Sequence, residues 1–202
     1  MDKEIIRAAL KEAISQRHST RKYSGEMVPD ELVEEVLDAG RNAPSGMNAQ
    51  NTRFFVITNA EKLAELKAVF TGIFANMQER EGMPPFLLQL VKTAKAGNLV
   101  DNTYGAPVLI VTANTKGAPN SIADCSCALE NMMLAASAAG LGNCWIDQCF
   151  TFRDAPPIRS FFEGLGLTEN EELCGALALG YAESAAAAQS PPVTGNPVTY
   201  IK

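Results

Sequence analysis

One segment, Ser121 to Ala139, limits the possible folds of this chain more than any other stretch. Larger apolar residues recur there at helical spacing: Ile122, Cys125, Leu129, Met132, Met133 and Ala136. Small or apolar residues fill much of the remaining helix surface: Ala123, Cys127, Ala128, Leu134, Ala135 and Ala138. A helix that is apolar on most sides is buried on most sides. In a chain of 202 residues it must therefore lie at the centre of the fold or in a subunit interface.

Helices and strands are predicted on both sides of this segment. Hydrophobic periodicity predicts helices over 2–16, from Pro29 onward, over 60–70 and over 154–162. Branched and aromatic runs predict strands over 53–58, 107–112, 144–147 and 173–181. Gly140 follows the apolar helix, as glycine commonly does at a helix C-terminus. No internal repeat or second domain boundary is evident, so we expect a single domain over residues 1–202.

Segment 71–98 allows two interpretations. It combines glycines and Pro84-Pro85 with apolar residues such as Phe74, Met83 and Phe86. It is either a mobile cover over a site or a pair of surface helices joined by a Gly-Met-Pro-Pro turn. Both interpretations fit the sequence equally well.

Charge and composition exclude several classes of partner. The net charge of -6 and the sequence pI near 4.9 disfavour nucleic acid, whose binders carry an excess of Lys and Arg. No apolar run approaches the roughly 20 residues that span a bilayer, so we expect no membrane segment. The polar start, Met1 to Glu4, does not resemble a signal peptide, and we expect a cytoplasmic location. Five cysteines at spacings unlike those of zinc sites predict reduced thiols and no metal.

The common hydrolase and nucleotide motifs are missing. The chain has a single histidine, His18, and no Gly-x-Ser-x-Gly motif that would supply a serine nucleophile. Neither a phosphate-binding Gly-x-x-x-x-Gly-Lys-Ser/Thr loop nor a Gly-x-Gly-x-x-Gly turn occurs. Amino-acid side chains do not accept hydride, so any redox chemistry would need a tightly held cofactor.

A basic pentapeptide, Arg17-His18-Ser19-Thr20-Arg21, follows the first predicted helix. Guanidinium groups bind phosphate bidentately, and hydroxyl and free backbone N–H groups add further donors. The cluster therefore predicts an anion site, although a solvated basic surface is the common alternative for such a run.

Motifs spread along nearly the whole chain resemble the FMN-dependent nitroreductase family. In order they are Arg17 to Arg21, Ala43-Pro44-Ser45-Gly46-Met47-Asn48-Ala49-Gln50, Phe54-Phe55-Val56, Ala135-Ala136 through Gly140-Leu141-Gly142 to Trp145-Ile146, and Leu179-Gly180-Tyr181. The resemblance implies an α+β fold with a central mixed, mainly antiparallel sheet flanked by helices. It also implies an intertwined homodimer with FMN at the subunit interface. The apolar helix would form the dimer core, and residues 182–202 would extend toward the partner's sheet.

The resemblance also assigns cofactor contacts, residue by residue. By resemblance, Arg17, His18 and Ser19 would contact the FMN phosphate and ribityl chain, and Arg21 would lie near the ribityl chain or the pyrimidine edge. Contacts from the other subunit fall on Pro44, Ser45, Gly46, Asn48 and Gln50. The backbone of Ile146, Asp147 and Gln148 would lie against flavin N5 and O4, and Asn102 would lie on the pyrimidine side. Plain core strand is the alternative for Trp145-Ile146. Many relatives also carry a C-terminal Lys or Arg at the phosphate, whereas this chain has no basic residue between Gly180 and Tyr200.

The implied activity is hydride transfer from NADH or NADPH to a small, flat, electron-poor acceptor such as a nitroaromatic or a quinone. FMN would carry the chemistry, and no catalytic side chain is assigned. Phe74, Met83 and Phe86 would help to form the acceptor pocket. Three alternatives remain: a non-catalytic flavin-binding or storage protein, a flavin-dependent reductive dehalogenase on the same fold, and a purely structural dimer. The dehalogenase is disfavoured because segment 71–98 lacks the tyrosine that deiodinase-like relatives use there.

Overall fold

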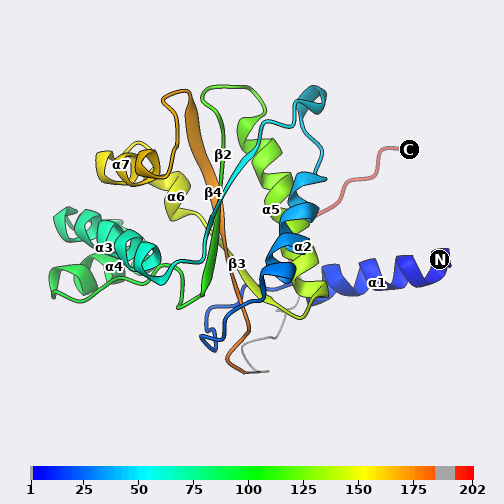
Figure 1. The fold of residues 1–202 in the computed structure, drawn as a ribbon, viewed down its shortest axis with the longest axis horizontal. Coiled ribbons are helices and arrows are strands. Elements are labelled where there is room, and N and C mark those ends of the chain that lie inside the picture. Colours follow the sequence, from blue (N-terminus) through cyan, green and yellow to red (C-terminus); the bar gives the residue numbers. More distant parts are fainter. Residues whose placement is uncertain (1, 185–193) are drawn as a thin grey trace.

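A four-stranded antiparallel sheet separates two groups of helices in the computed structural model, which describes residues 2–184 and 194–202 (Figure 1). The strand order is β1-β2-β4-β3, with β1 at Arg53–Ile57, β2 at Val108–Thr115, β3 at Gly142–Ile146 and β4 at Glu171–Gly180. The parallel pairing of Ser19 with Asn143 is an isolated bridge beside β3. The expected α+β class and mainly antiparallel sheet are confirmed.

The helices cover both faces of the sheet (Figure 1). On one side lie α3 (Ala60–Asn76), α4 (Pro85–Lys95), α6 (Gln148–Thr151) and α7 (Pro156–Gly164). On the other lie α1 (Lys3–Gln16), α2 (Asp30–Arg41) and α5 (Ser121–Ala138). No helix among the described residues is long and apolar enough to cross a membrane.

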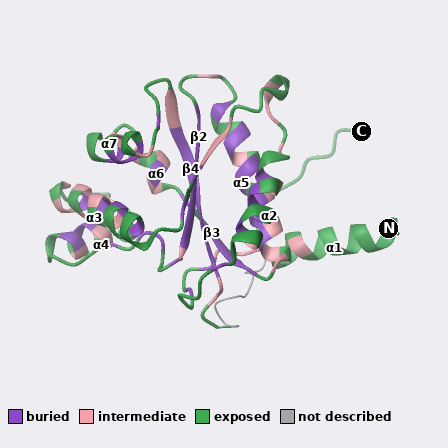
Figure 2. Cartoon of the chain, in the orientation of Figure 1, coloured by how far each residue is buried: buried purple, intermediate pink, exposed green. Residues whose placement is uncertain are grey.

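The two central strands are apolar on both faces because each face meets its own layer of helices. Along β2, Leu109 and Val111 belong to one hydrophobic cluster, while Val108 and Ile110 belong to the other. Strands that are buried on both faces read as continuous apolar runs, as the sequence indicated. Figure 2 shows this burial concentrated in the sheet and on the inner sides of the helices.

Helix α5 packs between the sheet and α2. Gly175 on β4 makes room for it, because a Cβ at this position would lie 2.9 Å from Leu129 Cδ1. The prediction of burial on most sides is correct for the face that carries Leu129 and Met132. Ile122 is 46% exposed in the single chain, on a face shared with Ala123 and Cys127, so the expected burial of this face in a subunit interface stays a prediction.

Segment 71–98 contains the end of α3, the connection after it and the helix α4, and its expected role as a cover over a site stays a prediction. Helix α3 continues to Asn76, beyond the expected end at residue 70, because the stripe of Leu66, Phe70 and Phe74 continues into the core. Phe74 is fully buried against Phe70 and Phe152. It is therefore not the pocket wall that we expected.

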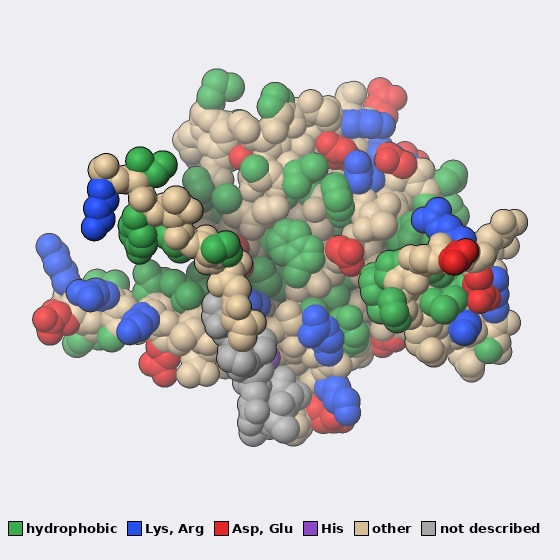
Figure 3. Space-filling view, turned by 180° about the vertical axis from the view of Figure 1, so that it is seen from behind, with side chains coloured by type: hydrophobic (Ala, Val, Ile, Leu, Met, Phe, Trp, Pro, Cys, Tyr) green, Lys and Arg blue, Asp and Glu red, His purple; other side chains and the backbone are tan. Residues whose placement is uncertain are grey.

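Two segments expose apolar side chains that nothing in the described chain covers. Helix α1 has no buried residue, and Ile6, Leu10 and Ile14 are 48%, 54% and 55% exposed along one stripe. In the C-terminal tail, Val198, Tyr200 and Ile201 are exposed and form no regular strand. Figure 3 shows hydrophobic side chains on the surface of both segments. Residues 185–193, within the expected 182–202 extension, lie outside the described residues.

Candidate functional site

The basic pentapeptide lies along the edge of β3. The Thr20 backbone N–H donates to the Asn143 carbonyl at 2.8 Å, and the Thr20 side chain is fully buried. Thr20 fits because Gly142 has no side chain: a Cβ there would lie 2.8 Å from Thr20 Oγ1. Thr20 thus fixes the segment, while Arg17 and Ser19 are half-buried and Arg21 is exposed.

His18 is oriented by its own segment. Its Nδ1–H donates to the Gln16 carbonyl at 2.8 Å, because a carbonyl can only accept. Its Nε2 lies 3.4 Å from Thr20 Oγ1. The imidazole ring is therefore held close to the backbone of the cluster.

Arg17, Ser19 and Arg21 converge on Cys144 of β3. Burial raises the pKa of the Cys144 thiol, while the charge of Arg21, a hydrogen bond with Ser19 and the charge of Arg17 act in the opposite direction. Asp147 adds a smaller effect that raises this pKa. Residues far apart in the sequence thus form one electropositive region at the end of the sheet.

Asn102 is the least satisfied polar side chain near this region. It is 4% exposed, and neither Nδ2 nor Oδ1 has a hydrogen-bond partner among the described residues. The same turn carries Tyr104, whose ring centroid lies 5.9 Å from the Arg21 guanidinium. Leaving a buried polar group unpaired costs about 1–3 kcal/mol, so the amide suits a ligand that offers both a donor and an acceptor.

The turn that carries Asn102 is fixed by Asp101. Its Oδ1 accepts from the backbone N–H and the hydroxyl of Thr103, at 2.9 and 2.8 Å. Its Oδ2 accepts from Lys67 Nζ of α3 at 2.9 Å. Burial alone would raise the pKa of Asp101, but the hydrogen bonds from Lys67 and Thr103 outweigh burial and lower it. The sequence analysis did not identify Asp101, although an Asp two residues before a Thr is a recognisable turn signal.

Ile146, Asp147 and Gln148 span the junction of β3 and α6. Ile146 is the last strand residue and is 2% exposed, so its side chain belongs to the core. Asp147 occupies the N-cap position of the short helix α6 without a side-chain capping bond, and Gln148 is the first residue of the helix. The predicted strand therefore ends one residue early, at a helix that the sequence analysis missed. The junction follows Cys144 along the chain, and Asp147 is close enough to Cys144 to affect the pKa of its thiol.

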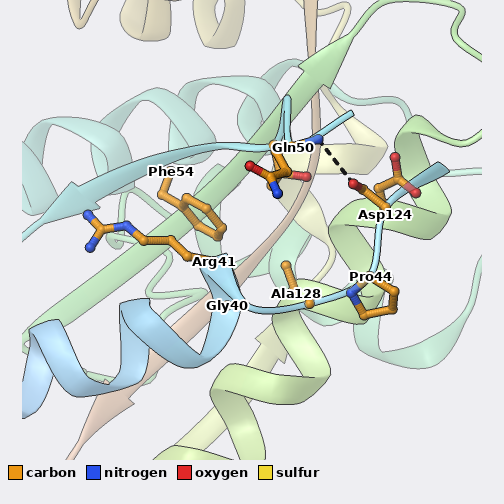
Figure 4. A pocket seen from close by; sticks show the side chains of 10 residues that line it. Gly40, Arg41, Pro44, Gln50, Phe54, Asp124 and Ala128 are labelled. Carbon is orange, nitrogen blue, oxygen red and sulfur yellow. Dashed lines mark hydrogen bonds between the residues drawn. The ribbon is translucent and has the colours of Figure 1, made fainter. Parts of the chain in front are cut away.

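Loop 44–50 lies elsewhere, against α2, β1 and the N-terminus of α5. A cavity of about 250 Å³ is lined there by Gly40, Arg41, Ala43, Pro44, Ser45, Gln50, Thr52, Phe54, Asp124 and Ala128 (Figure 4). Within the loop, Ser45 Oγ accepts from the Gln50 backbone N–H at 3.0 Å, and Gln50 Nε2 donates to Asn48 Oδ1 at 3.1 Å. The predicted contact residues Pro44, Ser45, Gly46, Asn48 and Gln50 therefore share one local structure.

The two groups of predicted site residues do not meet within one subunit. Gly46 packs at the N-terminal end of α5, whereas Thr20 packs on Gly142, just beyond its C-terminal end. With 18 residues, α5 is roughly 27 Å long at 1.5 Å per residue. The two groups accordingly lie near opposite ends of α5 (Figure 1). Among the described residues, no cluster of His, Cys, Asp and Glu could hold a metal ion.

Known proteins resemble this chain over most of its length. A model of the Nitroreductase family matches residues 14–181. The crystal structure of a nitroreductase with bound FMN from Bacteroides fragilis has a TM-score of 0.84 and 32% identity, covering 96% of this chain and 98% of that one. The nitrobenzene nitroreductase of Ectopseudomonas oleovorans is 27% identical over 202 residues, covering 85% of this chain and 86% of the relative.

A third similar protein differs in its named activity. The structure of iodotyrosine deiodinase bound to FMN and 3-iodo-L-tyrosine has a TM-score of 0.66 and 20% identity, covering 95% of this chain and 97% of that one. At this identity the likeness extends to the fold alone. The family model, by contrast, spans all of the elements that build the site except most of α1. Together with the fold and the basic cluster on β3, these matches establish that the chain belongs to the nitroreductase family.

Proposed function

We propose that the chain is an FMN-dependent oxidoreductase that takes hydride from NADH or NADPH and reduces flat, electron-poor acceptors such as nitroaromatics or quinones. The buried amide of Asn102, which has no hydrogen-bond partner in the described parts of the chain and lies near the basic pentapeptide, carries this proposal. FMN fits both features, because it has an anionic phosphate and a pyrimidine edge with both donors and acceptors. The FMN held by the Bacteroides fragilis relative and the name of the Ectopseudomonas oleovorans relative support the same reading.

Each part of the site has a separate role in this proposal. Arg17, His18 and Ser19 bind the phosphate and ribityl chain, and Asn102 pairs with the pyrimidine edge. Arg21 stabilises negative charge at that edge, since a fixed cation in a partly desolvated site is an effective electrostatic stabiliser. Backbone groups of Ile146, Asp147 and Gln148 orient the ring. FMN, when bound, supplies the hydride-accepting and hydride-donating chemistry.

The proposal includes a homodimer in which each flavin site is shared. Loop 44–50 and the basic pentapeptide lie near opposite ends of α5, a helix roughly 27 Å long, so the loop serves the flavin of the partner. The exposed α5 face with Ile122 and the uncovered stripe of α1 supply apolar surface for this interface. Exposed apolar surface of this kind marks interaction sites.

The C-terminal tail completes the dimer in this proposal. Strand β1 is an edge of the sheet, and a groove of about 360 Å³ runs beside it, lined by residues from Arg53 to Asn59 together with Lys62 and Leu165. The partner's residues 194–202, which include exposed Val198 and Tyr200, would add a strand along this edge. Such an addition satisfies the unpaired edge of β1.

The acceptor would enter from the side of α4. Phe86 is 63% exposed at the start of this helix, and Met83 is half-buried just before it. Both remain candidates for the walls of the acceptor pocket, whereas the buried Phe74 supports the fold.

Anaerobic mixing of the FMN-loaded protein with NADH or NADPH tests the function. We expect the visible flavin band to bleach with at least one of them and to return when nitrobenzene or a quinone is added. Bound FMN that neither nucleotide bleaches would identify a flavin-storage protein. Protein that takes up no FMN would leave only a structural dimer. An arm with 3-iodotyrosine as the acceptor, scored by iodide release, tests the dehalogenase alternative.

A further inference from the structure

Loop 44–50 has a backbone that needs outside support. Three of its non-glycine residues have left-handed conformations, with φ of 52° at Met47, 55° at Asn48 and 51° at Gln50. Non-glycine residues rarely take this conformation, and such strain persists only where surrounding structure holds it. The Met47 side chain is fully exposed and provides no such support.

Hydrogen bonds inside the loop fix its shape but do not attach it to the protein. Ser45 Oγ and the Ser45 carbonyl accept from the backbone N–H groups of Gln50 and Asn48, at 3.0 and 2.9 Å. The amides of Gln50 and Asn48 bond to each other. Among the described hydrogen bonds of residues 44–50, the one that leaves the loop runs from the Gly46 backbone N–H to Asp124 Oδ1 at 3.0 Å.

The N-terminus of α5 is shaped around Gly46. Asp124 lies in the first turn of this helix, is 9% exposed, and lines the cavity beside Pro44. Asn120 occupies the N-cap position, yet its side chain caps no helix N–H group. It packs on Gly46 instead, where a Cβ would lie only 2.2 Å from Asn120 Nδ2. Gly46 is thus held both through its N–H group and through its Cα.

We propose that Asp124 is a positioning residue that fixes loop 44–50 against the flavin of the partner subunit. The inference rests on the proposed function, because the loop matters only if a flavin lies against it. A carboxylate suits this role, since a charged acceptor strengthens the bond to a backbone N–H. Asparagine keeps an acceptor oxygen without the charge, whereas alanine removes the acceptor and leaves the Gly46 N–H unpaired.

The test compares Asp124→Ala, Asp124→Asn and a control, Asp30→Ala. The control also removes a first-turn carboxylate, that of α2, but none of the described hydrogen bonds joins Asp30 to the loop. In the FMN-free dimer, we expect faster amide hydrogen exchange at Gly46 and Gln50 in Asp124→Ala alone. We expect its FMN dissociation constant to rise about ten- to a hundredfold, against at most about fivefold for Asp124→Asn. The control should match the wild type.

Three outcomes overturn the proposal. Exchange at Gly46 that is unchanged in Asp124→Ala would mean that Asp124 does not hold the loop. Faster exchange with unchanged FMN affinity would mean that the loop position is irrelevant to the flavin, while the proposed function would stand. An equal loss of affinity in Asp30→Ala would point to general helix destabilisation. Wild-type protein that binds no FMN would instead refute the proposed function, and the exchange data would still report on the loop.

If Asp124→Ala does not fold, Gly46→Ala gives the same information. It keeps the N–H group but drives the loop away from Asn120. FMN affinity should fall at least tenfold and should recover in Gly46→Ala/Asn120→Gly, where the clash is gone and glycine remains an acceptable N-cap. Unchanged affinity in the single variant would contradict the proposal.

Discussion

The buried side-chain amide of Asn102 has no hydrogen-bond partner among the described residues. Asn102 buries an amide with two unsatisfied atoms, so the flavin-free protein bears a cost that a ligand would remove. Asn102→Leu should therefore leave the stability of the flavin-free protein unchanged or higher while weakening FMN binding at least tenfold. Thermal melts with and without FMN measure both. A lower melting temperature without FMN would show that the amide supports the fold instead.

The arginines of the basic pentapeptide should carry more of the phosphate charge here than in relatives with C-terminal basic residues. Arg17→Ala and Arg21→Ala should each reduce FMN affinity by about 1.5–3 kcal/mol, the usual range for a charged hydrogen bond. Higher salt should weaken wild-type binding, because partly exposed charges are screened. Equilibrium titration with FMN at two ionic strengths checks both effects. Full flavin retention in both variants would refute the assignment.

Asp101 should give the protein a specific sensitivity to acid. The pKa of Asp101 is lower in the folded protein than in the unfolded chain, where it is about 3.9. Its contribution to the free energy of unfolding is therefore complete above about pH 3.9 and is lost as the pH falls through the lower pKa of the folded protein. Asp101→Asn should therefore destabilise the protein at neutral pH and lose this disadvantage in acid. Urea unfolding across this pH range measures the difference between the two proteins. A constant difference down to strongly acidic pH would contradict this account.

Site residues whose side-chain chemistry indicates their role could be predicted from the sequence. Site residues whose role depends on where the fold places them could not. The Arg17 to Arg21 cluster was identifiable because guanidinium groups and a hydroxyl at a helix end indicate an anion site. Asp124 was not, because its importance depends on Gly46, 78 residues away, folding back onto the first turn of α5. Its one available signal was a carboxylate in the first turn of a mostly apolar helix.

Hydrophobic periodicity in the sequence predicts most of the helices and strands, whereas tertiary packing determines where they end. The predicted helix stopped at residue 70, yet α3 continues through Gly72 to Asn76 because Phe74 packs in the core. The short helix α6 has too few residues to show a period. Ile122 fits the buried stripe in sequence, and its exposure shows that one subunit does not cover all of α5.

Helix α1 offers the clearest test of the proposed dimer interface. Because it has no buried residue, Leu10→Glu should leave the fold of the subunit intact while weakening the dimer at least tenfold. Ala8→Glu adds the same charge on the opposite face of the helix and should have little effect. Sedimentation velocity over a dilution series separates the two variants. Equal dimer affinity in both would remove α1 from the interface.

For the whole molecule, the decisive feature is the distance that α5 imposes between the basic pentapeptide and loop 44–50. If each flavin site consists of the pentapeptide of one subunit and loop 44–50 of the other, a substitution in the pentapeptide and a substitution in the loop damage different parts of each site. Two inactive proteins, Arg17→Ala/Arg21→Ala and Gly46→Ala, should then complement each other when co-expressed. In the hybrid dimer, one site combines the intact pentapeptide of one subunit with the intact loop of the other, and the second site collects both defects. Recovered flavin and activity in the hybrid, but in neither parent, would be the genetic signature of a site divided between two chains.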